Sequence, residues 1–243
     1  MSHIHHIEPK GNRIINILIL IALIIIVSSP TMLAGAIIYS AVNSKDLWVF
    51  IIMVVIGIIW TIFIMWLFRW VYQKRSYEKM NQPFKLKDIL INILWFIIIR
   101  IIVSIFTIIM QNTYNDSISK NDKILMKQIE QLQHLSISSV ISLLFFLIMI
   151  IFIAPYLEEL LFRGIFKETL FKKSTFLLPL IISSIIFGGL HASTNWISFL
   201  MYVTIGFCLY MAYNRRKNVK DSMMVHVLNN AVAGVSMITI LFT

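Results

Sequence analysis

The sequence predicts an all-α fold, a polytopic helical bundle in a membrane with about seven transmembrane helices. Hydrophobic residues make up 59% of the 243-residue chain and charged residues 13%. A soluble domain would be about half apolar and about a quarter charged. The apolar residues are gathered in long runs, and the mean hydropathy is +0.86. These observations exclude an ordinary soluble domain.

Apolar runs of about 20 residues, the length that crosses a hydrocarbon core, define the predicted spans. In chain order we expect them at residues 14–42, 47–67, 89–110, 137–157, 176–190, 196–213 and 223–242. Pro30 is expected to kink the first span, because proline cannot continue the hydrogen bonding of a helix. The predicted organisation is an N-terminal tail (1–13), N-terminal helices with their connectors (14–136) and a core in the last four spans (137–243).

The basic residues lie mainly in the short connectors between these runs. The formal net charge is +10, but this placement fits orientation in a bilayer, so we expect no nucleic-acid partner. The connector after the second span carries six Lys and Arg residues against two acids, and Lys10 and Arg13 precede the first span. The positive-inside tendency makes both segments cytoplasmic. We therefore expect a multi-pass protein of the cell membrane with its N-terminus in the cytoplasm.

Two adjacent carboxylates, Glu158 and Glu159, follow the apolar run that begins near Ile137. Ionisable groups at membrane depth cost at least ~2.5 to 3.5 kcal/mol each, so they are rare and need partners. Glu159 and Arg163 are four residues apart and share a helix face. Glu158 is rotated by about 100° and points elsewhere. The spacing predicts one paired glutamate and one free glutamate.

The expected partners of the free glutamate lie downstream, in F-G-G-L-H (187–191) and H-V-L-N-N (226–230). Phe187 and His191 share one helix face, as do His226 and Asn230. If these faces converge on Glu158, the carboxylate can act as a general base and an imidazole can help deprotonate a water molecule. The Asn230 amide and the second imidazole can donate hydrogen bonds to a developing oxyanion.

The same residues leave two other interpretations open. Glu158, His191 and His226 form a His/His/Glu donor set typical of catalytic zinc sites, although H-E-x-x-H is absent. We favour a site without a metal or other cofactor, because Asn230 is a natural oxyanion donor and a poor zinc ligand. Alternatively, these polar side chains simply bond across helices as interhelical contacts.

The three segments E-E-L-L-F-R-G, F-G-G-L-H and H-V-L-N-N resemble, in order, the motifs of a known family. This is the CAAX-protease and bacteriocin-processing family, also called the Abi or type II CAAX prenyl endopeptidase family. Its patterns are E-E-x-x-x-R, F-x-x-x-H and H-x-x-x-N, and each is complete here. The resemblance covers roughly residues 137–241, and the compact chain looks like the bacterial members.

The resemblance implies an intramembrane endopeptidase acting on a peptide or a membrane protein. By motif position, Glu158 would activate water together with His191. His226 and Asn230 would stabilise the oxyanion, while Glu159, Arg163 and Phe187 would support the site. The bacterial members resemble processors of peptide pheromones or bacteriocins, or self-immunity proteins. A non-enzymatic immunity or scaffold protein is therefore the alternative, and a transporter that uses the polar cluster as an ion site is a third.

The predicted topology sets His191 and His226 at different depths. His226 lies only a few residues inside its span from the cytoplasmic side, whereas His191 ends a span that runs outward. For the motifs to meet, either the fifth helix is displaced inward or tilted, or the helix around Pro155 re-enters the membrane. Irregular backbone at that depth is allowed only against protein or a wet cavity.

Overall fold

The computed structural model describes residues 8–44, 46–77, 82–132, 136–172 and 174–239, and these residues form helices, turns and connectors without a strand. Most of the predicted N-terminal tail and the last residues of the seventh predicted span lie outside the described residues. The α-helices are α1 (Arg13–Ile26), α2 (Ser29–Asn43), α3 (Leu47–Arg75), α4 (Leu86–Tyr114), α5 (Lys120–Glu130), α6 (Ile137–Ile148), α7 (Ala154–Glu159), α8 (Lys167–Leu170), α9 (Leu177–Leu190), α10 (Trp196–Arg216) and α11 (Val219–Thr239).

The all-α membrane bundle is confirmed. Five described segments are long and apolar enough to cross a membrane: Arg13–Asn43, Leu47–Arg75, Leu86–Tyr114, Ile137–Leu170 and Trp196–Arg216. The fifth predicted span corresponds to α9, which has only 14 residues, and the seventh to α11, which is not among the five. The first span breaks between α1 and α2, and Pro30 lies in the first turn of α2 as its missing N–H favours.

The helices α6, α7 and α8 belong to one continuous 34-residue segment that contains two wide π-helical turns. These are η1 (Met149–Ile153) and η2 (Leu160–Phe166), and they enclose the single short helix α7. Pro155 stands in the first turn of α7 and has no N–H to donate to the preceding turn, which favours irregular hydrogen bonding there. Wide turns of this kind often occur at functional sites.

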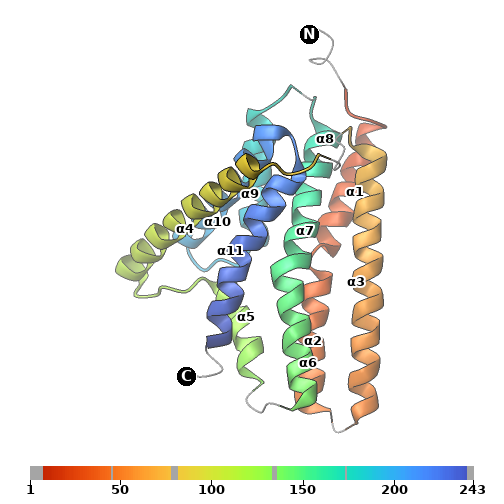
Figure 1. Ribbon diagram of the computed structural model, residues 1–243, viewed down its shortest axis with the longest axis vertical. Helices are drawn as coiled ribbons and strands as arrows, with labels where there is room; N and C mark the ends of the chain where they lie inside the picture. Colours follow the sequence, from red (N-terminus) through yellow and green to blue (C-terminus); the bar gives the residue numbers. More distant parts are fainter. Residues whose placement is uncertain (1–7, 45, 78–81, 133–135, 173, 240–243) are drawn as a thin grey trace.

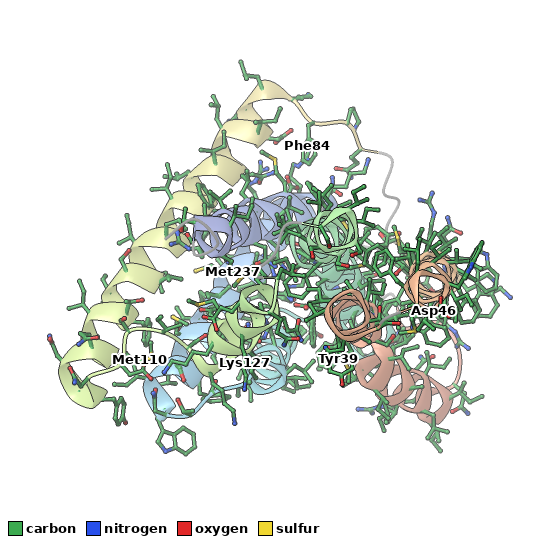
Figure 2. All side chains as sticks on the ribbon, turned by 90° about the horizontal axis from the view of Figure 1, so that it is seen from below. Tyr39, Asp46, Phe84, Met110, Lys127 and Met237 are labelled. Atoms are coloured by element: carbon green, nitrogen blue, oxygen red, sulfur yellow. The ribbon has the colours of Figure 1, made fainter. Side chains whose placement is uncertain are left out.

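Helices α1, α2, α3 and α6 to α8 run along the long axis of the molecule (Figure 1), whereas α4 crosses it obliquely on the other side. Helix α4 packs against α10 and α11, α9 packs against α10, and α11 also contacts α7 and η1. In the view along the long axis, α4 occupies one edge of the molecule between Phe84 and Met110 (Figure 2). Met237 of α11 and Lys127 of α5 lie between that edge and Tyr39 of α2.

A four-charge cluster joins α4, α10 and α11 at one end of the bundle. Arg215 bonds Asp88 at 2.8 Å and Asp221 at 3.1 Å, and Arg216 bonds each aspartate at 2.8 Å. Asn92 donates to Asp221 Oδ1 at 2.8 Å. The arginines end α10 and Asp221 lies in the first turn of α11, positions that both helix dipoles favour. The cluster therefore fixes the beginning of α11, five residues before His226.

We predict that Asp221→Asn destabilises the protein by about 3 to 5 kcal/mol, since removing one partner of a buried ion pair leaves the other charge uncompensated. The partly exposed arginines should keep the loss near the lower value. Thermal unfolding in one detergent would measure it, with Asp116→Asn as the control because the Asp116–Lys123 pair is partly exposed. Equal unfolding midpoints for the two variants would contradict the prediction.

Candidate active site

The innermost charged group of the site is Glu159, whose side chain is completely buried. Its Oε2 lies 3.2 Å from Arg163 Nε, which confirms the predicted pairing, and its Oε1 lies 3.0 Å from His226 Nδ1. Arg163 is also fully buried and donates to the Gly206 carbonyl oxygen of α10 at 2.8 Å. One carboxylate thus connects α7, η2 and α11, and its partner arginine connects them to α10.

Glu158 differs from its neighbour in having no ion-pair partner among the described residues. Its Oε2 is buried and accepts no hydrogen bond, and no ion pair within the described residues engages the side chain. The expectation of a free glutamate therefore agrees with the structure. The expectation that His226 would be its partner is wrong, because α11 approaches the face of α7 that carries Glu159. His191 also makes no hydrogen bond to Glu158.

His191 caps the end of α9 and is held by its own backbone and two rings. Its Nδ1 lies 2.8 Å from the Phe187 carbonyl oxygen, which can only accept, so Nδ1 carries the proton. In the neutral ring Nε2 is then a free acceptor. The imidazole stacks on Tyr202, with ring centres 4.4 Å apart, and the Phe187 ring lies 4.5 Å away on its own helix.

Phe187 links the two histidines. Its ring centre lies 5.6 Å from that of His226 as well as 4.5 Å from that of His191, and the Arg163 guanidinium lies 5.3 Å from the same ring. An aromatic face near a desolvated guanidinium is stabilised by a cation–π interaction. The motif phenylalanine therefore sets the spacing of both imidazoles above the buried ion pair.

The depth problem is resolved by the short length of α9. Its 14 residues rise about 21 Å, less than the ~30 Å of a hydrocarbon core, so His191 lies part-way along the bundle. His226 lies seven residues beyond the first residue of α11, or about 10 Å along that helix. A displaced fifth helix was one expected solution. The continuous segment Ile137–Leu170 argues against re-entry at Pro155.

Asn230 and His191 line one cavity of about 100 Å³, together with Arg100, Asn229 and Tyr202. One N–H of the Asn230 amide donates to the Ile150 carbonyl oxygen in η1 at 2.9 Å. An amide has a second N–H, which remains available for another acceptor. Glu158 and His226 are not among the lining residues, so the predicted site residues divide between this cavity and the buried ion pair behind it.

Tyr202 is a site residue that the sequence reasoning missed. Its hydroxyl lies 2.8 Å from Ser119 Oγ and donates to Asp122 Oδ1 at 3.4 Å. The Asn121 N–H also donates to the Ala192 carbonyl oxygen at 3.0 Å, so the beginning of α5 holds the segment after His191. The polar tip of a tyrosine inside an apolar span was the available signal, because a buried hydroxyl needs a partner.

The donor set proposed for zinc does not come together in the structure. In the described part of the chain, no three His, Cys, Asp or Glu side chains form a group that could hold a metal ion. His226 is turned toward Glu159, and neither Glu158 nor His191 contacts it through a hydrogen bond. Glu158, His191 and His226, as arranged, do not fit a shared ion.

We predict that the two adjacent glutamates contribute very different amounts to the free energy of unfolding. Glu159→Gln should cost about 3 to 5 kcal/mol, because it leaves the buried Arg163 without its counter-charge. Glu158→Gln keeps the side-chain shape and breaks no hydrogen bond to Oε2, so its effect should be much smaller. Parallel thermal unfolding in the same detergent measures both variants. A larger loss for Glu158→Gln would contradict the assignment of the paired glutamate.

Comparison with known proteins gives matches in the C-terminal part of the chain. Residues 140–232 match the family described as type II CAAX prenyl endopeptidase Rce1-like. The chain is 35% identical over 78 residues to "Putative membrane peptidase YdiL" of Bacillus subtilis (strain 168), covering 32% of this chain and 31% of that protein. It is 38% identical over 83 residues to "UPF0177 protein YxdF" of Lactococcus lactis subsp. lactis (strain IL1403), covering 34% and 44%.

The matched region spans less than half the length of either relative. No solved structure matches the chain. The matched residues nevertheless include Glu158, His191 and His226 with their complete motifs. Residues 140–232 of this membrane protein are therefore similar to the type II CAAX prenyl endopeptidase Rce1-like family.

Proposed function

We propose that this protein is an intramembrane endopeptidase that hydrolyses a peptide bond through a water molecule activated by Glu158 and His191. The observation that carries the proposal is the contrast between two neighbouring carboxylates. Each oxygen of Glu159 lies within ion-pair distance of a basic side chain, Arg163 or His226, whereas Glu158 has a buried oxygen and no ion-pair partner among the described residues. A partly buried carboxylate without such a partner is costly to retain, and such groups are common where a general base is needed.

In the proposed reaction, a water molecule lies between Glu158 and Nε2 of His191. One of these groups takes a proton while the water oxygen attacks the carbonyl carbon of the scissile peptide bond. The second N–H of Asn230 and Nε2–H of His226 stabilise the resulting oxyanion. The tetrahedral intermediate collapses, the C–N bond breaks, and the proton passes to the leaving amine.

His226 donates from Nε2 only when its ring is protonated on both nitrogens, because Nδ1–H faces Glu159. The adjacent carboxylate balances that positive charge. Glu159 thereby supports the oxyanion site without touching substrate, in line with its complete burial. The Phe187 ring keeps the two imidazoles apart.

The substrate that we propose is a peptide precursor, of the pheromone or bacteriocin kind, or the terminal segment of a membrane protein. The family match supports cleavage of the CAAX type in general terms. The cavity beside His191 and Asn230 has a volume of only about 100 Å³, which excludes a folded domain and is the scale of a single peptide group. The same chemistry with zinc, and a non-enzymatic immunity protein, are the outcomes that the next experiment separates.

We predict that Glu158→Gln and His191→Ala each lower the cleavage of a quenched peptide library by about a hundred-fold or more, the usual contribution of a general acid or base. The detergent-purified proteins would be assayed with and without a strong zinc chelator. Glu8→Gln, which removes an exposed carboxylate, should keep full activity. Cleavage should survive chelation.

Loss of cleavage on chelation, restored by zinc, would show that the reaction depends on zinc. Full activity of both site variants would contradict the proposed base. If the wild-type protein and both variants protected cells equally from a peptide toxin without cleaving it, the binding function would replace the enzyme.

We also propose that the N-terminus and the charged cluster at the beginning of α11 face the cytoplasm. In a Cys208→Ser background, Gln73→Cys and Asn43→Cys place single thiols at exposed positions, one near the end of α3 and the other shortly before its beginning. A membrane-impermeant maleimide applied to intact cells should label position 43 and spare position 73 until the cells are opened. The reverse pattern would invert the topology.

A further inference from the structure

Arg100 is a charged residue at the middle of a membrane-spanning helix. It is the fifteenth of the 29 residues of α4, so it lies about 21 Å from either helix end. A guanidinium at that depth is expected to face the protein interior or a wet cavity and to have a partner. Its sequence neighbours are isoleucines, which offer no polar contact.

Arg100 lines two cavities between α4, α5 and α11. The first, of about 100 Å³, is the cavity of His191 and Asn230, and the second has a volume of about 280 Å³. Both cavities share Val103, Asp122, Ala233 and Met237 with Arg100. The guanidinium therefore stands where a larger space adjoins the one that contains two of the proposed site residues. Figure 1 shows α4 running obliquely on this side of the bundle.

The bonding of Arg100 is weaker than that of the other arginines inside the bundle. Its Nη1 donates to Asn229 Oδ1 at 3.4 Å, a long bond to a neutral amide. By contrast, Arg163 lies 3.2 Å from a carboxylate oxygen, and Arg215 lies 2.8 Å from one. Within the described residues, no ion pair engages Arg100. A desolvated guanidinium prefers a carboxylate, which it binds through two parallel hydrogen bonds.

Asp122 is the acid on the wall of both cavities, and it is directed to a different partner. Its Oδ1 accepts from the Tyr202 hydroxyl at 3.4 Å, and its backbone N–H is bonded to Ser119 Oγ at 3.1 Å. It forms no ion pair with Arg100 in the described part of the chain. The cavity therefore contains a cation to which no described residue supplies a carboxylate partner.

We propose that Arg100 binds a carboxylate of the substrate and is a specificity-determining residue of this site. The inference rests on the proposed function and adds the chemistry of the substrate group that is recognised. The carboxylate is either the C-terminus of the peptide or an Asp or Glu side chain close to the scissile bond. Asn229 positions the guanidinium in the free protein and shares it with the carboxylate in the complex.

We predict that wild-type protein discriminates between matched peptide pools, measured as binding to protein in nanodiscs and as cleavage by it. One pair of fluorescein-labelled apolar peptides ends in a free carboxylate or a carboxamide. A second pair ends in a carboxamide and contains one Glu or one Gln. Binding is measured on the Glu158→Gln background so that no peptide is consumed. In one of the two pairs, the acidic peptide should bind roughly 10- to 100-fold more tightly than its neutral partner, the range of a charge-assisted hydrogen bond.

Arg100→Gln should reduce the ratio of acidic to neutral peptide binding to about one. Arg100→Lys should keep a reduced preference, because lysine retains the charge but lacks the two parallel N–H donors of the guanidinium. Arg13→Gln removes an exposed arginine at the beginning of α1 and should leave the preference unchanged. Asp122→Asn should keep or raise it, because it removes a competing carboxylate. Thermal unfolding of each variant identifies any that fail to fold, in which case Arg100→Lys decides.

The outcomes separate this inference from the proposed function. Cleavage with an equal preference in wild type, Arg100→Gln and Arg100→Lys would overturn the role of Arg100 and leave the peptidase intact. Carboxylate-dependent binding that Arg100→Gln abolishes, without cleavage by wild type, would keep the role of Arg100 and overturn the peptidase. Absence of a preference in both peptide pairs would overturn the carboxylate site. If Asp122→Asn abolished the preference for the acidic peptide, Asp122 and not Arg100 would determine that preference.

Discussion

The buried carboxylate of Glu159 is the interaction on which the rest of the core depends. Arg163 and His226 meet it at 3.2 Å and 3.0 Å in a completely buried setting. Water is excluded there, so each charge is tolerable only while its partner stays in place. Because the three residues come from α7, η2 and α11, the need for charge balance fixes these elements relative to one another. The bond from Arg163 to the Gly206 carbonyl oxygen extends this constraint to α10.

Beside this ion pair, the charged groups that lack an ion-pair partner are informative. Glu158 and Arg100 are intramembrane charges without an ion-pair partner among the described residues, whereas Arg163 and Arg215 each have one. Protein interiors tolerate few such groups, and those that persist are commonly functional. One is an anion beside the buried pair, and the other is a cation on the cavity of His191 and Asn230. A peptide substrate offers both a polar carbonyl to attack and a carboxylate to bind.

The local part of this arrangement was predictable from sequence, and the tertiary part was not. The pairing of Glu159 with Arg163 follows from a spacing of four residues, and the long apolar runs predict the bundle. The contact of His226 with Glu159 joins residues 67 positions apart, and it depends on which face of α7 meets α11. The depth of His191 depends on the early end of α9. Tyr202 was missed because an aromatic residue in an apolar span is ordinarily read as part of the packing.

The irregular backbone around α7 has a role in the same balance. A regular helix uses each carbonyl oxygen within its own ladder, but the η1 turn leaves the Ile150 carbonyl oxygen able to accept from Asn230. This bond orients the Asn230 amide. Because the amide group is planar, it also fixes the direction of the second N–H. The Ala154 N–H bonds the Met149 carbonyl oxygen instead of that of Ile150, and Pro155, which follows, has no N–H to donate. The wide turn, the proline and the motif asparagine therefore lie together, and the proposed oxyanion donor is oriented by a local irregularity of the helix.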